Sequence, residues 1–156
     1  MSSMMRRTAL VFLALAGVLA GVSAIAHAQA TPMGDKLVFI VRHAEKASAT
    51  EADPSLSEEG KARAAALAGA LSDARVSAII VTPRRRTTET AANVASATKV
   101  MPIIVPFGAS TPEHAASVAT AVRSSDAVAV LVVGHSNTVP AIIAALGGPR
   151  MPDLCD

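Results

Sequence analysis

Four short runs of apolar residues alternate along the chain with stretches whose apolar residues recur every three or four positions. The runs cover residues 37–41, 77–81, 100–105 and 127–133. Their continuous apolar character is typical of parallel strands that are covered on both faces. Pro102 interrupts the third run, and this predicts a strand at an edge of the sheet, because proline cannot donate to the ladder.

A helix is expected after each of these runs. The first should begin after Ser57, a good N-cap residue, and end near Leu71. One face of this helix would carry Ala64, Leu67, Ala68 and Leu71. The last should cover residues 138–146, where Gly147-Gly148 ends it.

Two threonine-proline pairs predict the starts of the second and third helices. In Thr82-Pro83 and again in Thr111-Pro112, a capping residue precedes a proline that suits the first helical position. The third helix is expected to end near Arg123. The whole alternation predicts an α/β fold, a three-layer α/β/α domain with a mainly parallel sheet over residues 35–156. Such sheets usually continue with another strand after the last helix, so the alternation also predicts a domain that lacks its last strand.

The first 28 residues resemble a signal peptide rather than part of this domain. Arg6 and Arg7 form a charged start, residues 9–20 are apolar, and cleavage is expected after Ala28 or Ala30. This predicts a periplasmic or secreted protein. A retained membrane anchor stays the alternative, because the apolar stretch approaches the roughly 18 residues that suggest a span.

Removing the signal changes the charge balance. The chain has 14 basic and 12 acidic residues, and Arg6 and Arg7 leave without any acid, so 12 basic residues face 12 acidic ones. A neutral chain with three Phe and no Trp or Tyr lacks the basic stripe and stacking platforms of a nucleic-acid binder. Cys155 is the single cysteine, which excludes an intramolecular disulfide.

Candidate chemistry gathers where the predicted strands end. Arg42-His43 follows the first strand, residues 84–86 are three arginines after the second, Glu113 follows the third, and His135 follows the fourth. The carboxyl ends of parallel strands meet at one edge of a sheet, which is where ligands bind in such folds. Guanidinium groups at a helix start favour a bound anion, and a phosphate group fits them best.

A neutral imidazole can attack phosphorus directly and form a phosphohistidine that water then hydrolyses. On this reading His43 is the nucleophile and His135 lies across the phosphate, while Arg42 and Arg86 neutralise its oxygens. Asn137 is a further phosphate contact, unless it only caps the last helix. No metal or other cofactor is expected.

Four sequence elements, in this order, resemble the histidine phosphatase superfamily, also called phosphoglycerate-mutase-like. They are Arg42-His43-Ala44-Glu45, Leu56-Ser57-Glu58-Glu59-Gly60, the Thr-Pro-x-x-Arg-x-x-x-Thr-Ala stretch at 82–91, and Gly134-His135. The resemblance runs from about Lys36 to Leu146. It implies that His43 is phosphorylated and that Arg42, Arg86 and His135 hold the phosphoryl group.

The general acid stays open between two carboxylates. Glu113 occupies the segment where the family carries its acid, although an acid after Thr-Pro also suits a helix start for electrostatic reasons alone. Asp53 in the first loop is the rival, and Glu45 is expected to orient the signature loop.

Three other functions compete with a phosphatase. His43, Glu45 and His135 have the composition of a two-histidine, one-carboxylate metal site, but such a site leaves the arginines unexplained. A non-catalytic phosphate-binding module would need the arginines but not the histidines. A mutase would share the same residues, yet this short chain lacks the insertions that would exclude water. The expected partner is a phosphorylated small molecule or a phosphoprotein, and the substrate and oligomeric state stay open.

Overall fold

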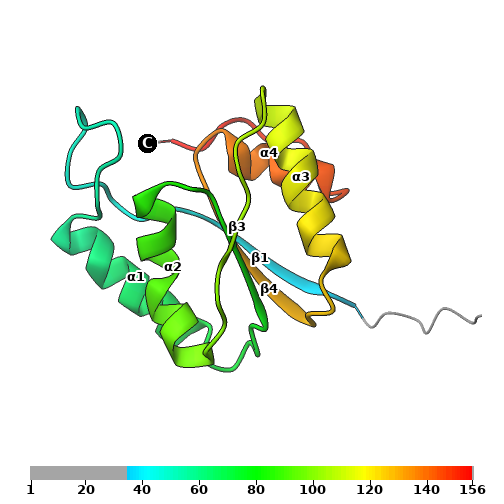
Figure 1. Ribbon diagram of the computed structural model, residues 1–156, viewed down its shortest axis with the longest axis horizontal. Coiled ribbons are helices and arrows are strands. Elements are labelled where there is room, and N and C mark those ends of the chain that lie inside the picture. The colour runs from blue at the N-terminus through cyan, green and yellow to red at the C-terminus, as the bar shows by residue number, and fades with distance from the viewer. Residues whose placement is uncertain (1–34, 156) are drawn as a thin grey trace, which may run out of the picture. The chain divides into compact units, whose positions relative to one another are not determined.

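The computed structural model describes residues 35–155, in which strands and helices alternate (Figure 1). The strands are β1 (Leu37–Arg42), β2 (Ala78–Val81), β3 (Ile103–Ile104) and β4 (Ala129–Gly134). The helices are α1 (Glu58–Ala70), α2 (Arg85–Thr98), α3 (Thr111–Ser124) and α4 (Thr138–Ala145). Within this part of the chain, none of the helices is both long and apolar enough to cross a membrane. The predicted signal peptide lies outside the described residues.

The four strands form one parallel sheet in the order β1-β4-β2-β3. Arg42 at the end of β1 is in register with Gly134 at the end of β4, and Val81 at the end of β2 is in register with Val133. The carboxyl ends of these three strands therefore meet at one edge. The prediction for the third strand is confirmed, because β3 is a two-residue edge strand that starts directly after Pro102.

Alternating residues of the strands face two separate cores. One core joins the sheet to α3 and α4, through residues such as Ile80, Val132 and Val118. The other joins it to α1 and α2, through residues such as Ile79 and Leu131. Figure 1 shows the two helix pairs on opposite sides of the sheet. The predicted three-layer α/β/α arrangement with a parallel sheet is thus confirmed.

The predicted helix caps are correct at one start and wrong at two. Ser57 caps α1, since its Oγ accepts from the Gly60 N–H at 3.1 Å. At α2 the N-cap is Arg84 rather than Thr82, because the Thr82 hydroxyl is used inside the protein. At α3 the cap is Ser110, one residue before the predicted Thr111.

Gly60 lets the start of α1 approach the loop after β1. A Cβ atom at this position would lie 2.3 Å from the backbone oxygen of Glu45 and 3.0 Å from its nitrogen. The Ser57 N–H donates to that same oxygen at 2.9 Å. The glycine of the Leu-Ser-x-x-Gly element therefore holds α1 directly against the Arg-His-x-Glu element.

Gly60→Ala is expected to destabilise the protein by about 2 kcal/mol, because a backbone group cannot move away from the added methyl group without displacing this loop. Gly69→Ala in the same helix is the matched control. Nothing lies within 4 Å of its Cβ position, so this change should stabilise by about 0.5–1 kcal/mol. Chemical denaturation of both variants measures the difference, and equal effects would contradict the packing argument.

Candidate active site

The edge where β1 and β4 end brings two histidines together. His43 directly follows β1 and His135 directly follows β4, and the His43 N–H donates to the Gly134 carbonyl at 3.0 Å. The two ring centroids are 5.3 Å apart, with planes inclined by 63°. Each residue is only 7% exposed. Two imidazoles from distant parts of the sequence therefore share one small, largely dry space.

The hydrogen bonds of His43 define its tautomer. Its Nδ1 lies 2.8 Å from the Ala44 carbonyl oxygen, which can only accept, so Nδ1 carries the proton. The lone pair is consequently on Nε2. Burial lowers the pKa of His43 below 6.5, and the positive charges of Arg86 and Arg42 lower it further, against a smaller opposing effect of the bond to Ala44. This ring is suited to act as a nucleophile.

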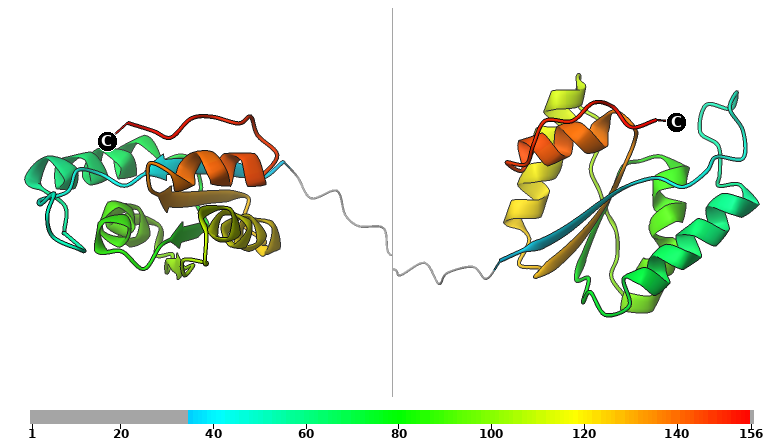
Figure 2. Two further views of the ribbon diagram at one scale, coloured as in Figure 1. Left: turned by 90° about the horizontal axis from the view of Figure 1, so that it is seen from above. Right: turned by 180° about the vertical axis from the view of Figure 1, so that it is seen from behind.

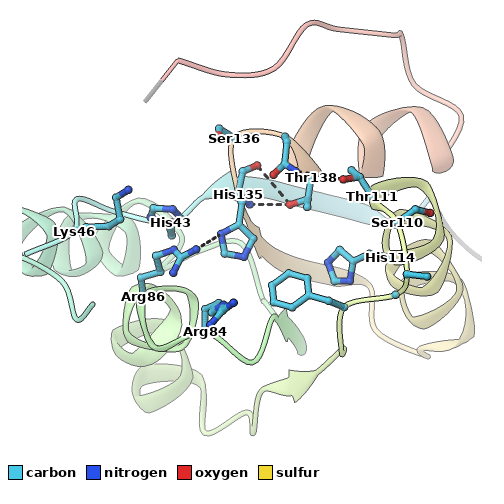
Figure 3. Close-up of a pocket in the computed structure, with 14 residues that line it drawn as sticks. His43, Lys46, Arg84, Arg86, Ser110, Thr111, His114, His135, Ser136 and Thr138 are labelled. Carbon is cyan, nitrogen blue, oxygen red and sulfur yellow. Dashed lines mark hydrogen bonds between the residues drawn. The ribbon is translucent and has the colours of Figure 1, made fainter. Parts of the chain in front are cut away.

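His135 also stays neutral. Burial, followed by the charge of Arg86, lowers its pKa to about 3. One guanidinium nitrogen of Arg86, Nη2, lies 3.3 Å from His135 Nδ1, and the other terminal nitrogen lies 3.6 Å from Asp53 Oδ1. Figure 3 shows His43, Arg86 and His135 directed toward a common point. Arg86 is thus placed as predicted, beside both histidines.

Arg42 is held by the segment that follows α4. Its Nη1 donates to the Cys155 carbonyl, and the Leu154 N–H donates to the Ser136 carbonyl at 3.0 Å. Figure 2 shows this segment running back over the carboxyl end of the sheet. Arg42 lines a second cavity of about 620 Å³ that also touches His43, instead of the cavity shared by the two histidines.

A cavity of about 520 Å³ opens beside the two histidines (Figure 3). Its wall carries three cationic side chains, of Lys46, Arg84 and Arg86, and no carboxylate among the described residues. The aromatic ring of Phe107 lies 5.6 Å from the His135 centroid, and the Arg84 guanidinium carbon lies 5.6 Å from the Phe107 centroid. The cavity is therefore suited to an anion attached to a group that packs against Phe107.

The sequence analysis missed several wall residues, above all His114, Phe107 and Thr82. His114 projects from α3 into this wall, is 1% exposed, and lies 3.0 Å through Nδ1 from the Pro106 carbonyl. A usable signal was present, because His114 falls four and eight residues before the core positions Val118 and Val122. Nothing in the local pattern could have identified Phe107.

The two candidate acids lie at different places, and neither lines the cavity. The Glu113 carboxylate accepts from the Ala109 N–H at 2.8 Å, so it braces the loop before α3. The Asp53 carboxylate accepts from the Arg85 N–H at 3.1 Å and pairs with Arg86. Asp53 is thus joined to the two histidines through Arg86, whereas Glu113 is not.

Asn137 and Glu45 occupy the edges of the site. Asn137 lines the cavity, and its side-chain nitrogen donates to Thr111 Oγ1 at 3.3 Å, so it provides no side-chain cap for α4. Glu45 is bound by Arg63 through two contacts of 2.6 and 2.9 Å. This pair ties the signature loop to α1.

A metal site built on His43, Glu45 and His135 does not fit this arrangement. The Glu45 carboxylate is taken by Arg63, and the Nδ1 proton of His43 is held by a backbone carbonyl. Within the described residues, no three His, Cys, Asp or Glu side chains gather closely enough to hold a metal ion.

The lowered pKa values predict how the two rings titrate. His135 is expected to stay neutral from pH 5 upward, because its pKa is about 3, and the midpoint of His43 should lie below 6.5. Both rings are therefore unprotonated at neutral pH. Histidine NMR signals followed from pH 4 to 9 measure these midpoints, and a His135 midpoint near 6.5 would contradict the burial argument.

Comparisons with known proteins now add to this geometry. Residues 38–106 match the family model of the histidine phosphatase superfamily (branch 1). That stretch contains His43, Asp53 and Arg86 but ends before His135. Among proteins with curated functions, none matches the chain in sequence.

Several solved structures share the fold. A SixA protein from Agrobacterium tumefaciens, assigned as a phosphohistidine phosphatase, is 27% identical, with a TM-score of 0.56 over 71% of this chain and 76% of that one. A similarly assigned SixA protein from Nakamurella multipartitia is 25% identical, with a TM-score of 0.53 over 74% and 72%. A mycobacterial glucosyl-3-phosphoglycerate phosphatase, 19% identical, has a TM-score of 0.56 over 71% and 79%, which indicates a shared fold alone.

Proposed function

Because the chain belongs to the histidine phosphatase superfamily, we propose that it is a metal-independent phosphomonoester hydrolase that works through a phosphohistidine on His43. The observation that carries this proposal is the state of the His43 ring. Its Nδ1 proton is bound to the Ala44 carbonyl, so its Nε2 presents a lone pair within a cluster of cationic side chains. A neutral nucleophile beside an anion-binding group is what attack on a phosphate ester requires.

The reaction has two displacements at phosphorus. In the first, Nε2 of His43 forms a bond to phosphorus, the bond to the ester oxygen breaks, and the departing alkoxide takes a proton from an acid. In the second, water attacks the same phosphorus and the nitrogen–phosphorus bond breaks. One water proton returns to the acid and the other leaves on inorganic phosphate. Arg86 and Arg42 neutralise the phosphoryl oxygens throughout.

The direct test is hydrolysis of p-nitrophenyl phosphate by the purified protein in the presence of EDTA. The proposal expects turnover that the chelator does not reduce, together with a labelled protein intermediate that is labile in acid and stable in alkali. Absence of turnover with any phosphate monoester, despite phosphate binding, would favour the non-catalytic module. Loss of activity in EDTA and recovery with Fe(II) would favour a metalloenzyme.

A phosphoglycerate-mutase-type transferase is the alternative within the same chemistry. Hydrolysis is favoured because the cavity wall comes from short loops, and Phe107 and Ser110 within it are exposed. Water can therefore reach a phosphohistidine on His43. Transfer of phosphate between the carbons of 3-phosphoglycerate without release of inorganic phosphate would reverse this preference.

We expect Asp53, rather than Glu113, to supply the proton to the leaving group, because only Asp53 contacts Arg86. Asp53→Asn should slow alkyl phosphates at least about tenfold more than p-nitrophenyl phosphate, whose leaving group needs no proton. Glu113→Gln is the matched control and should slow both substrates equally. The dependence of kcat on leaving-group pKa decides between them, and a steeper dependence for Glu113→Gln would contradict the assignment.

The cellular setting follows from the N-terminal sequence. Residues 1–28 are proposed to direct export to the periplasm or beyond, where a phosphorylated small molecule or an exposed phosphoprotein would be the substrate. Cell fractionation and the mass of the mature N-terminus test this, with cleavage expected after Ala28 or Ala30.

A further inference from the structure

A string of buried hydroxyl groups lies behind His135. Its Nε2 is 3.0 Å from Thr82 Oγ1, and Thr82 Oγ1 is 3.0 Å from Thr87 Oγ1. Thr87 Oγ1 in turn donates to the backbone carbonyl of Arg84 at 2.8 Å or of Thr82 at 3.0 Å. Thr82 is 2% exposed and Thr87 is fully buried. The nucleophile, the arginines and the candidate acids take no part in this string.

The two ends of the string impose one direction on its protons. At one end Arg86 can only donate, so His135 Nδ1 must accept. At the other end a backbone carbonyl can only accept, so the Thr87 proton points toward it. Between them, the Thr82 proton goes to Thr87, and the Nε2 proton of His135 goes to Thr82. Every proton then has an acceptor.

The opposite direction breaks two contacts. If Thr82 donated to His135 Nε2, the Nδ1 proton of the ring would point at the Arg86 guanidinium, which has no acceptor to offer. Thr87 would also have to turn its proton away from the backbone carbonyl to bond with Thr82. Because these groups are buried, water cannot replace the lost contacts, and unsatisfied buried groups are costly.

We propose that Thr82 is a positioning residue that, with Thr87, holds His135 as the Nε2–H tautomer. The Nδ1 lone pair of His135 then accepts from Arg86 and keeps the guanidinium aimed at the phosphoryl site. The hydrogen bond made by one ring nitrogen sets the role of the other. Thr82 therefore acts on phosphate through two intermediates, His135 and Arg86, without touching the substrate. Its kinetic consequence rests on the proposed phosphatase function, whereas the tautomer does not.

The tautomer is measured by ¹⁵N NMR of the histidine rings in the wild-type protein, before and after addition of inorganic phosphate. In the free protein, a proton on His135 Nε2 and a bare Nδ1 are expected. A proton on Nδ1 in the free wild-type protein would overturn the proposal, whatever the enzyme activity.

Three variants separate positioning from simple packing. Thr82→Val keeps the shape but removes the hydroxyl, and it is expected to lower kcat/KM for p-nitrophenyl phosphate about tenfold and to produce a mixture of His135 tautomers. Thr82→Ser keeps the hydroxyl and should restore the wild-type tautomer and activity within about twofold. Thr88→Val is the control, because Thr88 is exposed and its hydroxyl contacts only the Arg84 carbonyl, at 3.4 Å.

The outcomes distinguish this proposal from the proposed function. If wild-type protein hydrolyses no phosphate ester but shows the expected tautomer that Thr82→Val disturbs, the phosphatase assignment fails and the positioning role stands. If wild-type protein is active and Thr82→Val keeps both its tautomer and its activity, the positioning role fails alone. Equal losses in Thr82→Ser and Thr82→Val would also refute it, because the hydroxyl would then be irrelevant.

Discussion

His43→Ala is expected to lower kcat/KM for p-nitrophenyl phosphate by more than about 10³-fold, because it removes the atom that forms the bond to phosphorus. The acid-labile phosphoenzyme should disappear with it. Phosphate binding should persist, since Arg86 keeps its contacts to Asp53 and His135. Steady-state kinetics, phosphoenzyme trapping and a phosphate titration measure the three effects.

The interpretation depends on a folded variant, and the surroundings of His43 provide a control. Thr90 accepts from the Ala44 N–H at 3.0 Å and holds the same loop on α2. If His43→Ala keeps the thermal unfolding midpoint of the wild type, the lost activity belongs to the imidazole. Unchanged labelling of His43→Ala would instead place the phosphorylated residue elsewhere and refute the proposed chemistry.

Arg86→Gln is expected to lower kcat/KM by about 10²- to 10³-fold, the range found when one preorganised donor to a developing anion is removed. Arg86 is the cation that reaches both the His135 ring and the Asp53 carboxylate. Its charge also lowers the pKa of His43 and of His135. Both pKa values should therefore rise in this variant, which NMR titration can follow independently of activity.

Arg85→Gln is a closely matched control for this experiment. Arg85 is the neighbouring residue and carries the same charge, but it is exposed and pairs with Glu89 at 3.5 Å, away from the cavity wall. Its replacement should change kcat/KM by less than about twofold, since exposed ion pairs contribute little. Equal losses in the two variants would mean that the helix start attracts phosphate only by its total charge.

The elements of the fold were accessible from the sequence because each depends on local periodicity. Continuous apolar runs predicted the four strands, and Ser57 correctly predicted the start of α1. The wrong caps at Thr82 and Thr111 have a shared cause. A threonine before a proline can cap a helix, but Thr82 is drawn into the interior by His135, a residue 53 positions later.

The placement of the site follows the same division. His43, Arg86 and His135 could be predicted to share one edge, because parallel strands end together. Asp53 and Glu113 could not be ranked, since a carboxylate can reach several backbone groups, and its actual partner depends on how its loop packs. Phe107 and His114 enter the cavity wall only because α3 packs beside β4 and β2.

What the sequence determined by itself is the alternation of strands and helices, the end of each strand, and the identity of the groups that stand there. Tertiary structure alone decided the order β1-β4-β2-β3, the protonated nitrogen of each imidazole, and the acid that contacts Arg86. The physical reason is range. Periodicity and capping act over a few residues, whereas burial, tautomers and ion pairs depend on neighbours that only folding brings within hydrogen-bonding distance.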